Sequence, residues 1–263
     1  MARVLAISSH VVRGHVGLAA TVPALQWLGH EVWALPTVLL ASRPGLGPLV
    51  RHEVPAPDFC AMLAGLEADG CWASLDAVLT GYFPSPQAVQ AAAQAIGRIK
   101  HARPNVLVVV DPILGDAGRL YVAEATAAAI RDHLLPLASM VTPNRFELEW
   151  LTNAKPHAAD DVARAARQLG PPTVVVTSAW ETQQSVATLL VCGSGCVEHA
   201  TPRRRDIANG AGDLFAGLLL GRLLRHQTPA AALEATLSDL DRVLVASKGR
   251  PVLQLSALSG SKP

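Results

Sequence analysis

Short apolar runs alternate with helix-like segments along most of this chain of 263 residues. An apolar run covers residues 4–7, a segment with helical spacing covers 18–28, and a second predicted strand covers 31–38. A strand, a helix and a second strand in this order form the unit that builds parallel sheets with right-handed crossovers. The alternation therefore predicts a three-layer α/β fold, in which helices flank both faces of a mostly parallel central sheet.

The rest of the chain continues this alternation, with two exceptions. Residues 41–57 are rich in proline and glycine, so we expect a long loop there. Residues 185–191 and 196–200 are expected to pair as antiparallel strands around a turn at 193–195. Further strands are expected at 77–82, 106–110, 139–144 and 173–178, and helices at 58–68 (capped by Asp58), 86–101, 121–135, 160–169 and 229–246.

Six of the predicted strands end in residues whose side chains can make polar contacts. These residues are Ser9, Thr37, Tyr82, Asp111, Asn144 and Thr177. The carboxyl ends of parallel strands lie along one edge of a sheet, and open α/β sheets bind their ligands at that edge. The sequence therefore predicts an active site there.

Residues 209–220 combine a glycine-rich turn with a long apolar run. The first amides of a helix have no partner within it and lie at the positive end of its dipole, which makes a seat for an anion such as phosphate. A carboxylate at that seat would repel phosphate, so Asp213 is better suited to accept a proton from an attacking hydroxyl. The same residues are equally compatible with a loop that enters a core helix and has Asp213 as its cap.

Composition gives little sign of a macromolecular partner. The net charge of +1 and the charged fraction of 16% do not indicate a nucleic-acid or membrane surface, although Arg203–Arg205 form a local basic run. Four cysteines are too few and too scattered for a disulfide framework in a chain of this length. No signal peptide is apparent, and no apolar run approaches the roughly 20 residues of a membrane span. We expect a cytoplasmic protein with one domain over 1–255 and a flexible tail over 256–263.

Phosphoryl transfer would use three groups that this chain contains. Backbone amides of 210–212 could hold nucleotide phosphates, and Asp111 and Glu147 could hold a metal ion, which usually takes one or two carboxylates. Asp213 would be the base. Two alternatives remain open, since Asp111 precedes a proline and could be a turn residue, while Glu147 could be a first-turn charge on a helix that begins near Asn144.

Several segments taken together resemble pyridoxal kinases. They occur in the same order and with matching spacing from the N-terminus to about residue 220. The Asn-x-x-Glu and Gly-Ala-Gly-Asp segments alone would indicate only the wider ribokinase-like superfamily, whereas residues 8–17 and 80–82 indicate its vitamin B6 branch. The segments are 8–17 (SSHVVRGHVG), 31–33 (EVW), 36–38 (PTV), 80–82 (TGY), 111–116 (DPILGD), 142–149 (TPNRFELE), 176–178 (VTS) and 210–215 (GAGDLF).

The resemblance implies a ribokinase-like fold and an activity that depends on ATP and Mg²⁺. The implied reaction phosphorylates the 5′-hydroxyl of pyridoxal to give pyridoxal 5′-phosphate, with pyridoxine and pyridoxamine as further acceptors, Asp213 as the base and K⁺ as a candidate additional ion. Members of the family are typically cytoplasmic homodimers. The implied metal ligands are Asp111 and Glu147. The residues implied to contact the acceptor are Ser9, Val16, Val38, Pro44, Gly45, Tyr82 and Asp213. Those implied to contact ATP are Asp111, Asp116, Thr142, Asn144, Glu147, Thr177, Ser178, Arg205, Ile207, Ala208, Gly210, Ala211 and Gly212.

The chain also departs from the family pattern near the acceptor. Residues 41–46 read Ala-Ser-Arg-Pro-Gly-Leu, where the family usually has Ser-Asn-His-Thr-Gly-Tyr in a substrate lid. Leu18 stands in place of an asparagine, and Ala211 in place of a threonine. Two alternatives follow: a kinase for another acceptor, such as a hydroxymethylpyrimidine or a sugar, or a weakly catalytic protein that binds a B6 vitamer. Retention of Asp213 and Glu147 argues against the second.

Overall fold

The computed structural model describes residues 1–193 and 195–259 of the chain. Ser194, in the predicted hairpin turn, and residues 260–263, in the predicted tail, lie outside the described residues. Within the described part, the central sheet has nine strands in the order β11-β10-β9-β8-β5-β4-β1-β2-β3. The strands are β1 (Arg3–Arg13), β2 (Glu31–Ser42), β3 (Arg51–Glu53), β4 (Ala77–Thr80), β5 (Leu107–Val110), β8 (Met140–Val141), β9 (Thr173–Glu181), β10 (Ser185–Cys192) and β11 (Gly195–Pro202).

Strands β2, β1, β4, β5, β8 and β9 pair in parallel, whereas β3, β10 and β11 join antiparallel at the two edges. A separate two-stranded sheet, β6 (Gly115–Asp116) with β7 (Arg119–Leu120), follows β5. The predicted pair around the turn at 193–195 is present as β10 and β11. The mostly parallel sheet that the sequence predicts is therefore confirmed.

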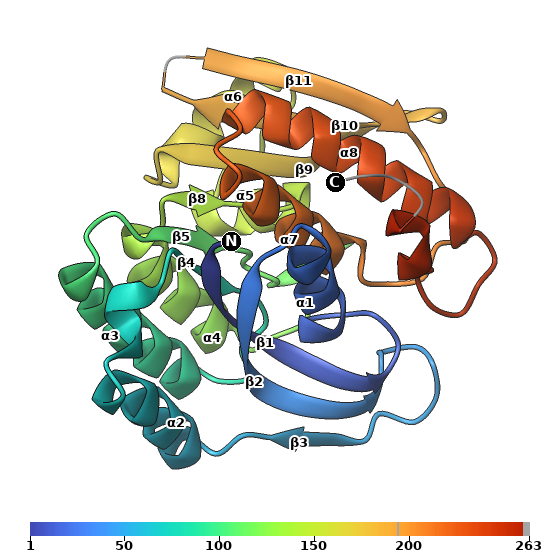
Figure 1. Cartoon of the computed structure of the whole chain (residues 1–263). Coiled ribbons are helices and arrows are strands. Elements are labelled where there is room, and N and C mark those ends of the chain that lie inside the picture. Colours follow the sequence, from blue (N-terminus) through green and yellow to red (C-terminus); the bar gives the residue numbers. More distant parts are fainter. Residues whose placement is uncertain (194, 260–263) are drawn as a thin grey trace.

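Helices cover both faces of this sheet (Figure 1). Successive side chains of a strand point to opposite faces, and in β4 Val78 packs into the core on one face while Ala77 and Leu79 pack on the other. The three-layer architecture is therefore confirmed. One layer contains α2 (Ala56–Ala68), α3 (Pro86–Ala102), α4 (Glu124–Ala129), α5 (Arg145–Thr152) and α6 (Ala159–Gln168), and the other contains α1 (Leu18–Trp27), α7 (Ala211–Leu223) and α8 (Pro229–Ala246).

Local sequence signals account for several helix boundaries. The Ser85 hydroxyl accepts a hydrogen bond from the Ala88 amide at the start of α3, and Thr228 caps α8 in the same way. Both helices have proline at the first position, where the missing N–H has no helical partner in any case. The predicted helix at 229–246 is therefore confirmed at both ends. Among the described residues, no helix is long and apolar enough to cross a membrane.

Three expectations about local structure were wrong. The predicted loop at 41–57 contains the end of β2 and all of β3, whose side chains are exposed and therefore leave no apolar pattern to read. Helix α2 begins at Ala56 with Pro55 at its N-cap, so Asp58 lies in the first turn and is not the cap. The helix expected at 121–135 begins only at Glu124 and changes into a π-helical turn at Ile130–Leu134.

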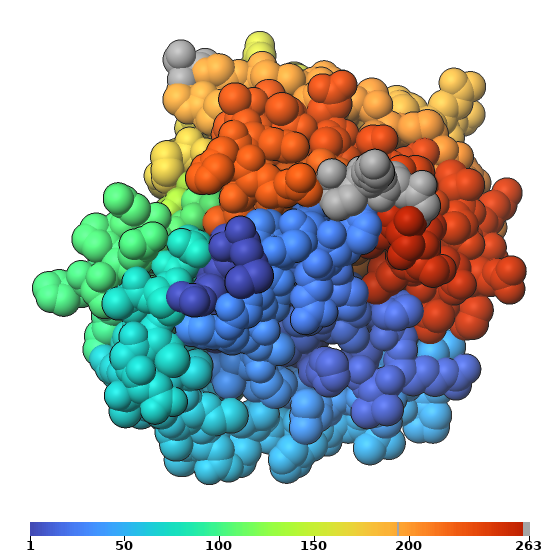
Figure 2. Space-filling model, in the orientation of Figure 1, coloured from blue at the N-terminus to red at the C-terminus, as the bar shows by residue number. Residues whose placement is uncertain are grey.

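The end of the described chain is packed against the core. A short 3-10 helix covers Leu255–Leu258, and Leu258 is 2% exposed in a cluster that joins α1, α7 and α8. The expected flexible tail therefore cannot begin at residue 256. Figure 2 shows these last described residues, in red, lying against the blue of the N-terminal third.

Candidate active site

The sheet places the polar strand ends at one edge. In the register, Ile7 lies beside Thr80, Thr80 beside Val110, and Val110 beside Val141, so β4, β5 and β8 end at the same level. Strands β1, β2 and β9 continue past this level, so the expectation that they end at Ser9, Thr37 and Thr177 was wrong, and these residues lie within the strands. Backbone hydrogen bonds continue this alignment past the strand ends, from the Asp111 amide to the Thr80 carbonyl and from the Thr142 amide to the Val110 carbonyl. Asn144 and Thr177 form a parallel bridge one strand further along. From β4 to β9, the residues at this level therefore lie side by side across the sheet.

Helix α7 begins at this edge with the geometry of an anion seat. Gly210 is its N-cap, with φ at +114°, and a Cβ added there would lie 1.8 Å from the His15 carbonyl oxygen. Only glycine fits such a position. At Gly212, by contrast, a Cβ would meet nothing within 4 Å. The space beside Gly212 is therefore open at the N-terminus of α7, where a helix has amides without a helical partner.

Asp213 lies in the first turn of α7 and is not its N-cap residue. Burial raises the pKa of its carboxyl to about 6, although hydrogen bonds from the Gly17 amide and from its own amide favour the charged form. The Thr21 hydroxyl donates to the Asp213 backbone carbonyl at 3.2 Å and joins α1 to the start of α7. A carboxylate of this pKa is ionised at neutral pH yet basic enough to accept a proton from a reacting hydroxyl.

Asp111 adds a second buried carboxylate beside Asp213, and the two line one small cavity between β1, β4 and α7. The Thr142 hydroxyl donates to Asp111 Oδ1 at 3.0 Å. Burial raises the pKa of Asp111 well above its usual range, and the charges of Glu147 and Asp213 raise it further. Among the described residues, none of these three carboxylates forms an ion pair. The site is therefore suited to a cation.

Glu147 completes a capping box at the N-terminus of α5. Asn144 Oδ1 accepts from the Glu147 amide at 2.9 Å, and Glu147 Oε2 accepts from the Asn144 amide at 2.8 Å. Glu147 therefore lies in the first turn of a helix that begins at Arg145, one of the two positions considered for it from the sequence. Its other oxygen, Oε1, accepts from the amides of Leu114 at 2.8 Å and Gly115 at 3.4 Å.

The Asn-x-x-Glu segment therefore links two separate parts of the edge. Asn144 Nδ2 donates to the Gly115 carbonyl at 2.8 Å, so Asn144 and Glu147 both bind the loop at residues 114–115. That loop follows Asp111 and contains Ile113 at φ +40°, a conformation that costs energy for a β-branched residue. Burial raises the pKa of Glu147 to about 7. Glu147 therefore holds this loop in place by hydrogen bonds.

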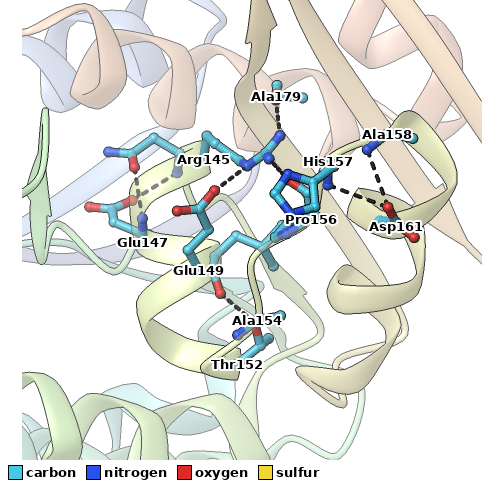
Figure 3. A network of polar contacts seen from close by, with 12 residues as sticks. Arg145, Glu147, Glu149, Thr152, Ala154, Pro156, His157, Ala158, Asp161 and Ala179 are labelled. Atoms are coloured by element: carbon cyan, nitrogen blue, oxygen red, sulfur yellow. Dashed lines mark hydrogen bonds and ion pairs between the residues drawn. The ribbon is translucent and has the colours of Figure 1, made fainter.

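Arg145 fixes α5 against β9 and is a residue that the sequence reasoning missed (Figure 3). Its Nε donates to Glu149 Oε1 at 2.6 Å, its Nη1 donates to the Ala179 carbonyl at 2.7 Å, and its Nη2 donates to the Pro156 carbonyl. The only signal in the sequence was the spacing of Arg145 and Glu149, which lie four residues apart on one helix.

The residues expected to bind the acceptor form an apolar wall. Val16 and Val38 are buried together with Val11 and Leu40, and Tyr82 packs against them. The Tyr82 backbone is held on both sides, because its carbonyl accepts from the Thr37 hydroxyl and its amide donates to the Ser8 hydroxyl.

Ser9 is 7% exposed and lies under the loop that carries Val16. A Cβ added to Gly17 would lie 2.1 Å from the Ser9 carbonyl oxygen, so this loop packs tightly on the end of β1. Pro44 and Gly45 lie in the β2–β3 connection, where the Pro44 carbonyl is 3.4 Å from Asn209 Nδ2. The acceptor residues and the start of α7 are therefore neighbours.

The residues expected to bind ATP are more dispersed. Ser178 follows Thr177 in β9 at φ +46°, and Asp116 is exposed at the end of β6, where it accepts from the Ala117 amide. Arg205 is exposed, Ala208 is buried, and the Ile207 side chain packs against the cluster beside α1 and α7. The side chain of Ile207 is thus used for packing.

Comparison with known proteins identifies close relatives. The phosphomethylpyrimidine kinase family matches residues 68–247. The chain is 34% identical over 244 residues to pyridoxal kinase PdxY of Corynebacterium diphtheriae, which covers 90% of this chain and 86% of that relative. It is 35% identical over 231 residues to pyridoxal kinase of Arabidopsis thaliana, with 83% of this chain and 73% of that relative covered.

Solved structures of pyridoxal kinases superimpose on almost the whole of this chain. Pyridoxal kinase from Entamoeba histolytica superimposes with a TM-score of 0.92 at 25% identity, over 100% of this chain and 97% of the other. Pyridoxal kinase from Leishmania donovani, solved in complex with ADP and pyridoxine, superimposes with a TM-score of 0.88 at 29% identity, over 97% and 90% of the two chains.

Proposed function

The chain belongs to the pyridoxal kinase family, and from this premise we propose that it transfers a phosphoryl group from ATP to the 5′-hydroxyl of pyridoxal, giving pyridoxal 5′-phosphate. The observation that carries the proposal is the start of α7. There, open space beside Gly212 lies in the same helical turn as a carboxylate whose pKa is about 6. An anion seat and a base on one helical turn serve phosphoryl transfer to a hydroxyl better than they serve binding alone.

Each part of the site has a proposed task. The amides of residues 210–212 hold the phosphates and stabilise the negative charge of the transferring group. Asp213 accepts the proton of the 5′-hydroxyl as its oxygen attacks phosphorus, and the wall of Val16, Val38 and Tyr82 orients the pyridine ring while Ser9 contacts it. Because these groups are fixed before the reaction, little reorganisation is needed when charge develops.

The donor set fits a magnesium ion. Asp111 and Glu147 are close enough for their charges to interact, and no cation among the described residues pairs with either. Within the described residues, no group of three or more His, Cys, Asp or Glu side chains is arranged to hold a metal. Magnesium commonly binds through one or two carboxylates plus water and substrate phosphates. We propose that Asp111 and Glu147 hold Mg²⁺ directly or through water, and that the ion, when bound, neutralises phosphate charge.

The remaining nucleotide contacts are proposals of the same kind. Asp116, Thr142, Asn144, Thr177 and Ser178 lie on the β5–β9 side of the edge and are proposed to contact ATP. The loop of Arg205, Ile207 and Ala208 precedes α7 and is proposed to cover the nucleotide through its backbone. A cytoplasmic homodimer and a requirement for K⁺ remain predictions from the family resemblance.

A kinase for a hydroxymethylpyrimidine is the second candidate. The matching family carries the description phosphomethylpyrimidine kinase, and residues 41–46 depart from the usual pyridoxal lid. Both acceptors present a hydroxymethyl group on a flat heterocycle. The apolar wall would hold either ring.

An assay across acceptors tests the proposal. Purified protein with ATP and Mg²⁺ is given pyridoxal, pyridoxine, pyridoxamine or hydroxymethylpyrimidine, and the phosphorylated product is measured. We expect pyridoxal to give the highest kcat/KM and the Asp213→Asn variant to give little product with any acceptor. If a pyridoxal kinase of known activity forms pyridoxal phosphate in the same assay and this protein does not, the proposal is wrong. Turnover of hydroxymethylpyrimidine alone would select the second candidate.

A further inference from the structure

Residues 249–254, which we call the C-terminal strap, run between α8 and the last 3-10 helix. The strap is anchored to α8 through Ser247, which is fully buried. Its hydroxyl donates to the Val243 carbonyl at 2.6 Å and accepts from the Gln254 amide at 2.8 Å. Leu253 is also fully buried and packs in one cluster with Leu214 of α7. The strap is thus held firmly beside the helix that carries Asp213.

Arg43 joins the acceptor side of the site to this strap. Its Nε donates to the Pro251 carbonyl at 2.7 Å, and its Nη1 donates to the Pro44 carbonyl at 2.9 Å. The stem of the side chain lies over Gly14, where an added Cβ would be 3.1 Å from Arg43 Cβ and Cγ. The two hydrogen bonds use the fork of the guanidinium, whose donors point in fixed directions.

A second contact supports the same junction. His15 Nδ1 lies 2.8 Å from the Leu253 carbonyl oxygen, and the His15 carbonyl oxygen lies against Gly210 at the start of α7. The loop over Ser9 and the β2–β3 connection therefore both reach the strap. Both belong to the acceptor side of the proposed site.

The strap also contacts the loop that precedes α7, on the nucleotide side. The Gly249 amide donates to the Asp206 carbonyl at 3.1 Å. Further along this loop, Asn209 Nδ2 approaches the Pro44 carbonyl at 3.4 Å, the same oxygen that accepts from Arg43. A displacement of residues 206–209 would thus be felt at Pro44 directly and at Arg43 through the strap.

We propose that Arg43 is a positioning residue, which couples occupation of the nucleotide side to the order of the β2–β3 connection over the acceptor. A nucleotide bound at the start of α7 fixes residues 206–210, the strap follows through Gly249, and Arg43 transmits the restraint to residues 41–47. Arg43 forms no ion pair within the described residues. Its removal therefore leaves no carboxylate unpaired. The inference rests on the proposed nucleotide site but not on the identity of the acceptor.

Hydrogen–deuterium exchange tests this coupling with ADP alone as the probe. Three amides within residues 41–47 report on the order of this segment, because the amides of Ala41, at the end of β2, and of Arg43 and Leu46 donate to the Val50, Arg13 and Arg43 carbonyls respectively. We expect ADP to slow exchange across residues 41–47 by about fivefold or more in the wild type, a coupling of the usual size between two sites. In Arg43→Ala this protection should be lost while ADP binds with little change in affinity.

Arg164→Ala is the matched control. Arg164 is an exposed arginine that pairs with Asp161 on α6, and its loss should leave the protection intact. Equal protection of residues 41–47 in the wild type and Arg43→Ala, or none in the wild type despite ADP binding, would overturn the inference. The proposed function fails separately, if the wild type shows the protection but phosphorylates no B6 vitamer. Failure of the wild type to bind ADP would overturn both.

Discussion

Replacement of Asp213 by asparagine should make the protein more stable and nearly inactive. Burial raises the pKa of this carboxyl from 3.8 to about 6, so its ionised form is less favourable in the folded protein than in the unfolded chain. At about 1.4 kcal/mol per pH unit, this corresponds to a penalty of about 3 kcal/mol at pH 8. Asparagine has nearly the same shape and carries no charge, so the penalty disappears.

The sign of the pH dependence distinguishes this cause from ordinary packing effects. Below the unfolded pKa of 3.8 the carboxyl is protonated in both states and the penalty is absent. It grows as pH rises and is complete above the folded pKa of about 6. Loss of the Asp213 charge also relieves its repulsion of Asp111, which adds stability in the same direction.

Two measurements check the prediction. Denaturant unfolding at pH 8 and pH 5 should show Asp213→Asn to be more stable by up to about 3 kcal/mol at pH 8, with roughly half that advantage at pH 5. A kinase assay should show a loss of about 10²- to 10⁴-fold, the usual contribution of a general base. For the wild type, kcat/KM should rise about tenfold between pH 5 and pH 7, as a base of pKa near 6 ionises. Destabilisation at pH 8, or a loss of activity below tenfold, would refute the reasoning.

Two further sets of variants test the surroundings of Asp213. Glu147→Gln should lose about 1–3 kcal/mol of hydrogen bonding, because an amide cannot accept all three backbone hydrogen bonds that Glu147 now accepts. It also removes a buried charge whose pKa is raised from 4.5 to about 7, a penalty that is nearly absent at pH 4 and about 3 kcal/mol at pH 8. The stability of the variant relative to the wild type should therefore rise by about 3 kcal/mol between pH 4 and pH 8, and a difference in the free energy of unfolding that does not change with pH would contradict this. Gly210→Ala should lower the free energy of unfolding by about 1–3 kcal/mol, since the added Cβ would clash with the His15 carbonyl at a positive φ. Gly212→Ala should keep the stability of the wild type but raise the KM for ATP, because its methyl group enters the space left for phosphate. Similar stabilities for the two alanine variants would contradict this account.

The layered fold could be predicted because buried strands have a strong sequence signature. Residues 107–110 are almost continuously apolar, as strands covered on both faces must be. Exposed strands have no such signature. All three side chains of β3 are exposed, and its pairing with β2 depends on backbone hydrogen bonds to an edge that the sequence does not mark. Proline and glycine on either side therefore suggested a loop.

Only part of the candidate site could be predicted from the sequence. Asp111 and Asp213 could be placed together because parallel strands end at one edge, and the structure does bring them to one cavity. The contacts of Glu147 with residues 114 and 115 depend on a loop conformation with a positive φ at Ile113, an isoleucine that gives no sequence signal for it. The C-terminal strap was missed for a similar reason, since it is bound through backbone carbonyls that any sequence could supply.

The distribution of charge at the edge sets conditions on how the proposed reaction can proceed. The carboxyl of Asp111 interacts with those of Glu147 and Asp213, and the three place negative charge in the site. The N-terminus of α7 attracts the phosphates of a nucleotide, whereas these carboxylates repel them. A divalent cation at Asp111 and Glu147 would remove the repulsion on that side and leave Asp213 as the one carboxylate free to accept a proton. The same cation would lower the raised pKa of Asp111 and of Glu147, because a nearby positive charge favours the ionised form. Only Asp213, which the hydrogen bond from Gly17 holds on the acceptor side, would then keep a pKa suited to general base catalysis. Three similar carboxylates would in this way take different roles according to which of them faces the metal.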